Sequence, residues 1–380
     1  MSFTALGLSK HFQHALEAQG YKTPYAIQAQ AIPVILKGED VLGIAQTGSG
    51  KTASYVLPLL SSLKFSRTKN RLVNGLVLVP TRELAQQVLD VFHSFESSLP
   101  QRVQVQAVYG GVSINPQMKN LFGVNILVAT PGRLLELVQA KALELGEVQS
   151  LVLDEADKML NMGFKEELNQ ILDLLPAKRQ NLLFSATLST DLQSITQVVL
   201  RKPKVIKIEI EDANFVDQIK QTGYFVPAEK KGPLLRYIIK ENDFKQVLIF
   251  TSSYYQADNV ADKLRKNGVQ ASASHSKKSM HARKEALRKF KEGTLRVLVA
   301  TDLLSRGIDI EFLPCVVNYD LPRSPKDFIH RIGRTGRAEA TGEAIVLVTP
   351  EDKAHFRVIQ KKMGKWVTMI DSENISLKGF

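Results

Sequence analysis

Short apolar runs recur along this chain between longer amphipathic stretches, and this alternation limits the possible folds more than any other feature. In the first half the runs are residues 41–44, 76–79, 126–129, 151–153 and 182–184. Runs of this length without polar alternation are typical of strands that are buried on both faces. Between them, stretches such as 82–95 and 164–175 carry apolar residues at helical spacing. The pattern predicts an α/β fold in which helices cover a mostly parallel sheet.

The alternation is interrupted near residues 201–232 and then resumes, which predicts two domains. An acidic, Asn-containing stretch and the segment 227–232 lie in the interruption, and apolar runs return from 247–250 onward. A length of 380 residues fits two domains, each large enough for its own core. We expect domains at residues 1–207 and 219–365, joined by a linker at 208–218 and followed by a short tail at 366–380.

The composition indicates a polyanionic partner. Lys and Arg total 50 and Asp and Glu total 38, which gives a net charge of +12 that both halves share. Nucleic acid, an acidic membrane surface and an acidic protein all satisfy this charge. The single cysteine, Cys315, excludes an internal disulfide framework and a Cys-rich zinc site. Without a secretory pattern at the start or an apolar run of about 18 residues, we expect a cytoplasmic protein.

A phosphate-binding loop is predicted directly after the run 41–44. Its residues are Ala45, Gln46, Thr47, Gly48, Ser49, Gly50, Lys51 and Thr52. The glycines let backbone N–H groups converge on phosphate oxygens, Lys51 can reach the β- and γ-phosphates, and the Thr52 hydroxyl can ligate Mg²⁺. Ala45 stands where the strict pattern has Gly. A Gly/Ser-rich surface loop would explain the glycines, but it would not explain the Lys-Thr pair or the preceding strand.

Two acids follow the run 151–153, at the end of a predicted strand where ligands bind in open α/β sheets. Asp154 is predicted to hold Mg²⁺, and Glu155 is predicted to polarise the water that attacks the γ-phosphate. An acidic helix cap is the alternative, because acids favour helix starts. The phosphate loop about a hundred positions earlier favours the catalytic interpretation.

Residues 154–157 spell D-E-A-D, and the chain resembles the DEAD-box ATP-dependent RNA helicases, most of all their compact bacterial RhlE group. The other motifs stand in family order at 80–85, 110–111, 130–133, 185–187, 301–302, 306–309 and 330–337. The resemblance implies two RecA-like domains with a short flexible linker. It also implies that ATP binds between the domains and that RNA lies across both.

The resemblance further assigns nucleotide contacts. Phe3 packs against adenine, and Gln28 selects ATP over GTP, although the family's second proline is replaced by Ala26. Asp309 accepts from the ribose, while Arg334 and Arg337 contact the γ-phosphate and Arg337 is the arginine finger. Arg331, Arg334 and Arg337 recur every third residue, which predicts one face of a helical turn. Coupling of the γ-phosphate site to the domain interface is assigned to Ser185, Ala186 and Thr187.

RNA contacts are also implied by the resemblance. They are assigned to Pro80, Thr81, Arg82, Gly110, Gly111, Thr130, Arg133, Arg283 and Thr301. Such residues meet the sugar–phosphate backbone, so we expect binding that is largely independent of base sequence and sensitive to salt. The basic cluster at 277–291 is expected to be mainly a solvated helix face. Trp366 is expected to pack on the second domain rather than stack on a base.

Three functions fit these residues. The favoured one is a monomeric, RNA-stimulated ATPase that unwinds short RNA duplexes locally without translocating. An ATP-gated clamp that unwinds little and a DNA helicase of similar build are the alternatives. We expect ATP and Mg²⁺ as cofactors, RNA as partner and no membrane association.

Overall fold

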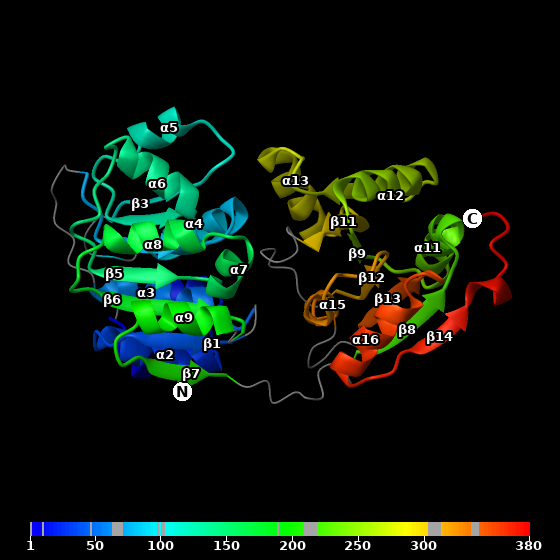
Figure 1. The fold of residues 1–380 in the computed structure, drawn as a ribbon, viewed down its shortest axis with the longest axis horizontal. Coiled ribbons are helices and arrows are strands. Elements are labelled where there is room, and N and C mark those ends of the chain that lie inside the picture. Colours follow the sequence, from blue (N-terminus) through cyan, green and yellow to red (C-terminus); the bar gives the residue numbers. More distant parts are fainter. Residues whose placement is uncertain are drawn as a thin grey trace. The chain divides into compact units, whose positions relative to one another are not determined.

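The structure is a computed structural model that describes residues 2–9, 11–45, 48–62, 71–96, 99, 103–187, 190–208, 219–302, 313–335 and 342–380. The chain divides into two compact units, Met1–Glu209 and Ile210–Phe380 (Figure 1). Across the described ranges, no helix combines the length and the hydropathy that a membrane span requires.

The first unit is built on a seven-stranded sheet in which every pair of neighbours is parallel. Its strands are β1 (Val41–Ile44), β2 (Gly75–Leu78), β3 (Val105–Val108), β4 (Ile126–Ala129), β5 (Ser150–Leu153), β6 (Gln180–Ser185) and β7 (Lys204–Lys207). They lie in the order β3-β4-β2-β5-β6-β1-β7. Each of the five apolar runs falls on a strand, so the predicted α/β class is confirmed for this unit.

Alternate residues of these strands enter two hydrophobic cores, one on each face of the sheet. Leu182 and Phe184 belong to one core, and Leu183 between them belongs to the other. The first core includes residues of α1 (His11–Ala18), α2 (Ala26–Leu36), α3 (Lys51–Ser62) and α4 (Arg82–Glu96). The second includes or contacts residues of α5 (Ile114–Lys119), α6 (Pro131–Gln139), α7 (Ala156–Asn161), α8 (Lys165–Asp173) and α9 (Thr190–Val199). Burial on both faces is why the strands read as continuous apolar runs.

The second unit repeats this design with a second all-parallel sheet, in the order β10-β11-β9-β12-β13-β8-β14. Its strands are β8 (Lys220–Phe225), β9 (Val247–Thr251), β10 (Ala271–Ser274), β11 (Val297–Thr301), β12 (Cys315–Asn318), β13 (Glu343–Val348) and β14 (Thr368–Asp371). Its helices are α11 (Lys231–Glu241), α12 (Tyr254–Lys266), α13 (Met280–Lys291), α15 (Pro325–Ile332) and α16 (Lys353–Met363).

The two sheets have the same topology. When each unit's strands are numbered from its own first strand, both orders are third, fourth, second, fifth, sixth, first, seventh. The rhythm that the two halves share in sequence therefore corresponds to a shared fold. Strands at the same position of the two sheets can therefore carry similar motifs at their ends; Thr130 follows β4, for example, and Thr301 ends β11, the strand at the same position.

The end of the chain differs from the expectation of a short tail at 366–380. Residues Thr368–Asp371 form β14, which pairs in parallel with β8 and completes the edge of the second sheet (Figure 1). The side chain of Trp366 just before this strand is 71% exposed, so the expectation that it packs on the second unit is wrong. Its neighbour Val367 is the residue that enters the core.

Candidate active site

The sheet order of the first unit separates the predicted nucleotide motifs from the predicted RNA motifs. All strands are parallel, so their carboxyl ends meet at one edge of the sheet, where open α/β sheets bind ligands. The phosphate loop, the acids and the segment 185–187 follow the adjacent strands β1, β5 and β6. Residues 80–82, 110–111 and 130–133 follow the adjacent strands β2, β3 and β4. The two groups lie side by side on one edge.

The phosphate loop connects β1 to the first turn of α3. Gly48 and Gly50 have φ angles of 81° and 83°, a left-handed conformation that a side chain would strain. A Cβ atom at Gly50 would also collide with the Gln28 amide. Ala45 and Ser49 lie in the described part of the loop, whereas Gln46 and Thr47 lie outside it. Because α3 begins at Lys51, its free N–H groups point toward the loop and favour an anion there.

Lys51 is buried at the base of this loop, with only 8% of its surface exposed. Its Nζ donates a hydrogen bond of 2.6 Å to the carbonyl of Ala45. Burial lowers the pKa of Lys51, and the nearby carboxylate of Asp154 opposes this shift. The ammonium group is held by fixed acceptors at the position where a nucleotide phosphate is predicted to bind.

Asp154 is oriented by two donors. Its Oδ2 accepts from the hydroxyl of Tyr55 at 2.8 Å, and its Oδ1 accepts from the backbone N–H of Glu155 at 2.9 Å. Burial raises the pKa of Asp154, while Lys51 and the Tyr55 hydrogen bond favour its ionised form. Tyr55 is completely buried, so its hydroxyl fixes this carboxylate from inside the unit.

Glu155 has a strained backbone and a partly satisfied carboxylate. Its φ of 53° places a non-glycine residue in the left-handed region at the start of α7. Its Oε1 lies 2.5 Å from Lys158 Nζ, whereas its buried Oε2 has no hydrogen-bond partner among the described residues. Burial raises the pKa of Glu155, and Lys158 opposes the shift. A buried carboxylate oxygen without a donor is suited to accept a hydrogen bond from water.

The residues at this edge fit a Mg²⁺ ion that arrives with a nucleotide. Among the described residues no group of three acidic, His or Cys side chains could hold a metal alone. Mg²⁺ is commonly bound through one or two carboxylates together with substrate phosphates. Each Asp154 oxygen accepts one described hydrogen bond and keeps further acceptor capacity, and Thr52 lies in the first turn of α3. Asp154 and Thr52 would therefore hold the ion.

The last acid of the D-E-A-D segment is tied to the segment 185–187. Thr187 Oγ1 donates to Asp157 Oδ2 at 2.7 Å. The Ser185 hydroxyl donates to the Thr187 carbonyl at 2.8 Å, and Ala186 lies between them after the end of β6. The hydrogen bond from Thr187 to Asp157 thus connects the predicted coupling residues to the acidic segment.

The two residues assigned to adenine lie in different surroundings. Gln28 is fully buried: its Oε1 accepts from Tyr25 N at 2.9 Å and its Nε2 donates to the Gly50 carbonyl at 3.1 Å. Phe3 lines a cavity of about 380 Å³ together with Tyr21 and other residues of the segment 2–22. Gln28 is not among the residues that line this cavity. The amide of Gln28 is therefore bound to the phosphate loop in this structure.

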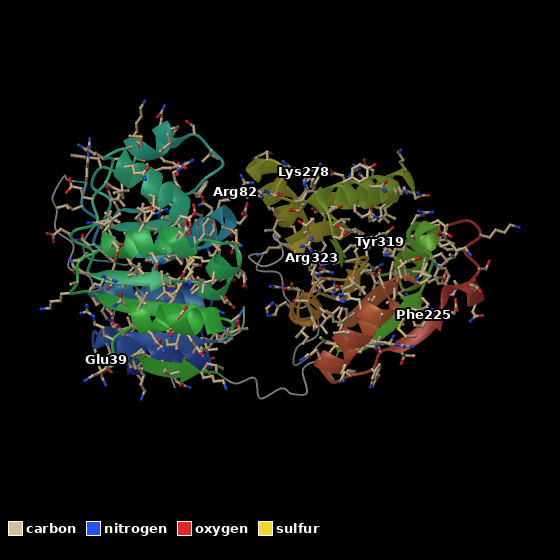
Figure 2. The ribbon with its side chains drawn as sticks, viewed as in Figure 1. Glu39, Arg82, Phe225, Lys278, Tyr319 and Arg323 are labelled. Atoms are coloured by element: carbon tan, nitrogen blue, oxygen red, sulfur yellow. The ribbon has the colours of Figure 1, made fainter. Side chains whose placement is uncertain are left out.

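The RNA residues assigned to the first unit converge at the ends of β2, β3 and β4. A Cβ atom at Gly111 would lie 3.3 Å from Arg82 Nη1, and Gly110 N donates to Thr130 Oγ1 at 3.4 Å. Arg133 is only 7% exposed, and its Nη2 donates to the Val112 carbonyl at 2.8 Å. Arg133 thus supports the loop that carries the two glycines. Figure 2 labels Arg82, which begins α4 at this edge.

Pro80 and Thr81 complete this group. Pro80 is buried after the end of β2. Thr81 Oγ1 accepts from Leu84 N at 3.3 Å, which caps the first turn of α4. The Thr81 hydroxyl therefore also stabilises the helix that presents Arg82.

In the second unit, Arg331 is used internally. It is 2% exposed, and its guanidinium contacts both oxygens of Asp302 at 2.5 and 2.7 Å and Asn318 Oδ1 at 3.0 Å. Helix α15 ends at Ile332, so Arg334 lies in the turn after Gly333. The expectation that Arg331, Arg334 and Arg337 share a face of a helical turn is therefore wrong for the first two, because the helix stops between them.

The remaining assigned residues of the second unit are only partly described. Thr301 ends β11, while Arg283 lies in the first turn of α13 and is 5% exposed. Asp309 and Arg337 lie outside the described residues.

The sequence motifs did not predict the hydrogen bond from Tyr55 to Asp154. Tyr55 lies four residues after Lys51 in α3, so both side chains share a helix face and both reach the Asp154 region. The spacing of Tyr55 from Lys51 could have indicated that Tyr55 lies at the site. It could not indicate the partner, because Asp154 lies 99 residues away in the chain.

Replacing Tyr55 by Phe removes the donor to Asp154 and keeps the ring. The buried carboxylate oxygen then loses its described hydrogen bond, so we expect the free energy of unfolding to fall by about 1–3 kcal/mol. We also expect half-maximal ATP hydrolysis to require more Mg²⁺, because Asp154 is less well oriented. Urea unfolding and a Mg²⁺ titration measure these effects. A Tyr254→Phe variant, changed at an exposed site, is the matched control, and equal behaviour of the two variants would contradict the assigned role.

Two family models match most of the described chain. Residues 25–195 match the DEAD/DEAH box helicase family and residues 229–339 match the helicase conserved C-terminal domain. The chain is 40% identical to the ATP-dependent RNA helicase DeaD of Buchnera aphidicola, a match that covers 96% of this chain and 60% of that protein. It is 38% identical to the DEAD-box ATP-dependent RNA helicase CshA of Geobacillus kaustophilus, covering 95% of this chain and 76% of that one. Both relatives are longer than the matched region.

A solved structure has the same fold. Dbp5 of S. cerevisiae, bound to RNA and ADP BeF3, matches with a TM-score of 0.84 and 28% identity, covering 98% of this chain and 96% of that one. The similarity confirms the prediction of two RecA-like domains.

Proposed function

Since the chain belongs to the DEAD-box family of ATP-dependent RNA helicases, we propose that ATP binding closes its two units on RNA and that this closure separates short duplexes locally, without translocation. The observation that supports this most is the first sheet's carboxyl edge, where the nucleotide residues and the RNA residues occupy adjacent strand ends. A change in the position of residues at the γ-phosphate site can therefore shift the RNA residues, because both groups follow neighbouring strands of one sheet.

The first unit prepares the nucleotide for hydrolysis. Residues of the segment 45–52 cradle the phosphates, and Lys51 neutralises their charge. Mg²⁺, held by Asp154 and Thr52, supplies further charge neutralisation when bound. Glu155 accepts a hydrogen bond from the attacking water through its buried Oε2 and orients that water toward the γ-phosphate.

The second unit completes the site on closure in this proposal. Arg334 and Arg337 add positive charge to the γ-phosphate as the transition state forms, and Asp309 accepts from the ribose. Closure is then favoured by any ligand that both units bind, and RNA is that ligand. The hydrogen bond between Thr187 and Asp157 couples the nucleotide site to the domain interface in this proposal.

RNA recognition in this proposal depends on the sugar–phosphate backbone. Glycines allow close approach, hydroxyls and backbone N–H groups bond phosphate oxygens, and arginines neutralise them. The affinity is therefore expected to be independent of base sequence and to fall steeply with salt.

The proposal is tested by comparing ATP hydrolysis with single-stranded RNA and DNA of equal length and sequence. We expect strong stimulation by RNA, weak stimulation by DNA, and strand separation of a short RNA duplex only when ATP is present. Equal stimulation by both nucleic acids would overturn the RNA assignment. Hydrolysis without any loss of duplex would overturn unwinding in favour of an ATP-gated clamp.

A further inference from the structure

Helix α16 presents a face that is basic and free of acids. Its sequence from Lys353 to Met363 contains Lys353, Arg357, Lys361 and Lys362, and no Asp or Glu. All four basic side chains are exposed, whereas Phe356, Ile359 and Gln360 are buried on the opposite face. Lys353, Arg357 and Lys361 follow one another at intervals of one helical turn and cover about 12 Å of the helix axis.

These cations are not neutralised by neighbouring acids. Among the described residues no Asp or Glu forms an ion pair with Arg357, Lys361 or Lys362. The basic cluster at 277–291 is different: Arg288 pairs with Glu285 and Glu292 at 2.8 and 2.7 Å. Lys278, labelled in Figure 2, likewise pairs with Asp258. A polyanion could therefore bind the cations of α16 without displacing an acidic partner, whereas Arg288 of α13 is already paired with acids.

An exposed tryptophan follows this basic face. Helix α16 ends at Met363, and the cap residue Gly364, with a φ of 75°, turns the chain. Trp366 comes two residues after Gly364, with 71% of its surface exposed. The residues on both sides are fixed, because Lys365 Nζ donates to the Ile219 carbonyl at 3.2 Å and Val367 N donates to Gln360 Oε1 at 2.8 Å. Trp366 is thus displayed by an ordered turn whose other members are anchored.

The end of this surface lies at the opposite edge of the second sheet from Thr301. Strands β13 and β14 both run parallel to β8, so α16 must return the chain from the carboxyl edge of the sheet to its amino edge. Lys361 and Lys362 at the end of α16, and Trp366 just before β14, therefore lie toward the amino edge. Thr301 ends β11 and therefore lies at the opposite, carboxyl edge.

We propose that Trp366 and the basic face of α16 form a second binding surface for single-stranded RNA. The indole stacks on an unpaired base, and Arg357, Lys361 and Lys362 bind phosphates of the adjoining nucleotides. The proposal rests on the proposed function, since the RNA bound here is the strand that the RNA motifs engage elsewhere. Two contacts on one strand raise its affinity beyond that of either site alone.

Neither helix electrostatics nor an acidic protein partner accounts for the whole surface. Cations in the last turn of a helix complement its dipole, but this accounts for Lys361 and Lys362 and not for Arg357 or for the exposed ring. An acidic protein would satisfy the charge, but it would not specifically require a flat aromatic surface held outward. A base and its phosphate satisfy both features together.

The experiment uses the chain's single tryptophan as its reporter. Trp366 is the only indole in the sequence, so fluorescence excited where tyrosine does not absorb reports on this surface alone. We expect titration with single-stranded oligouridylate to quench this fluorescence, with or without nucleotide. Trp366→Ala is expected to weaken binding of the same RNA at least about 5-fold.

Charge reversal tests the basic face. The double variant Lys361→Glu and Lys362→Glu should abolish the quenching and reduce the slope of log affinity against log salt by about 0.7 for each phosphate that is no longer bound. It should leave ATP hydrolysis at saturating RNA unchanged. The matched control is Lys263→Glu with Lys266→Glu, which makes the same change in the last turn of α12 and should keep the quenching.

The outcomes separate this proposal from the proposed function. Normal RNA-stimulated hydrolysis without quenching would overturn the second surface and leave the helicase assignment intact. Absence of RNA stimulation in the unmodified chain would overturn the helicase assignment itself. Quenching by polyglutamate as strong as that by oligouridylate would overturn RNA as the occupant in favour of an acidic protein.

Discussion

Replacing Glu155 by Gln is expected to abolish steady-state ATP hydrolysis, with a loss of about 10²–10⁴-fold, while ATP and RNA still bind. Gln keeps the size of the side chain but removes the negative charge that polarises the attacking water. The buried Oε2, which has no described donor, is the atom whose acceptor strength falls. Contacts of Lys51 and Asp154 with their own partners are unaffected by the change.

The measurement is turnover at saturating RNA, together with equilibrium binding of a fluorescent ATP analogue. Glu166→Gln is the matched control, because it removes the same charge from an exposed position of α8 and should hydrolyse ATP normally. Turnover that persists in Glu155→Gln would show that another group orients the water. Loss of ATP binding in this variant would instead indicate that Glu155 supports the phosphate loop.

The strands and their burial were largely predictable from the sequence. The runs 41–44 and 126–129 are apolar throughout because helices cover both faces of the sheet, and each run coincides with a strand. Strand β3 was missed because Gln106 interrupts its apolar residues, and β7 because Lys204 and Lys207 bracket it. Both strands lie at the edges of the sheet, where one side lacks a neighbouring strand and polar residues are tolerated.

The site was predictable as a set of motifs but not as a set of contacts. Lys51 and Asp154 are recognisable from local patterns, since each follows an apolar strand. The hydrogen bond of Tyr55 to Asp154 joins elements 99 residues apart, and the pair Arg331 and Asp302 joins elements 29 residues apart. Such pairs depend on the order of the strands, and no local pattern specifies that order.

The exposure of Trp366 was also not predictable from the local sequence. Tryptophan is highly buried on average, which favoured packing, although lysines precede Trp366 in the sequence. Its exposure follows from the left-handed turn at Gly364 and from the burial of Val367, which together direct the intervening side chain outward.

Replacing Lys51 by Met is expected to reduce ATP affinity about 10- to 100-fold, because a hydrogen bond to a charged group contributes about 1.5–3 kcal/mol. Turnover falls further, by about 10²–10³-fold, since the ammonium also stabilises charge that develops on the transferred phosphate. Met keeps most of the volume of the buried side chain, so α3 should retain its packing. A competition titration of a fluorescent ATP analogue measures the affinity, and single-turnover hydrolysis measures the chemical step.

The loss should be specific to Lys51 because its position is unusual for a cation. Burial lowers its pKa, and the Ala45 carbonyl and nearby carboxylates such as Asp154 favour the charged form there. Lys119→Met, at an exposed position of α5, removes the same charge without these surroundings and should bind ATP normally. Thermal unfolding checks that Lys51→Met remains folded. Unchanged ATP affinity in a folded Lys51→Met protein would contradict the phosphate site at the carboxyl end of β1, and with it the proposed use of ATP.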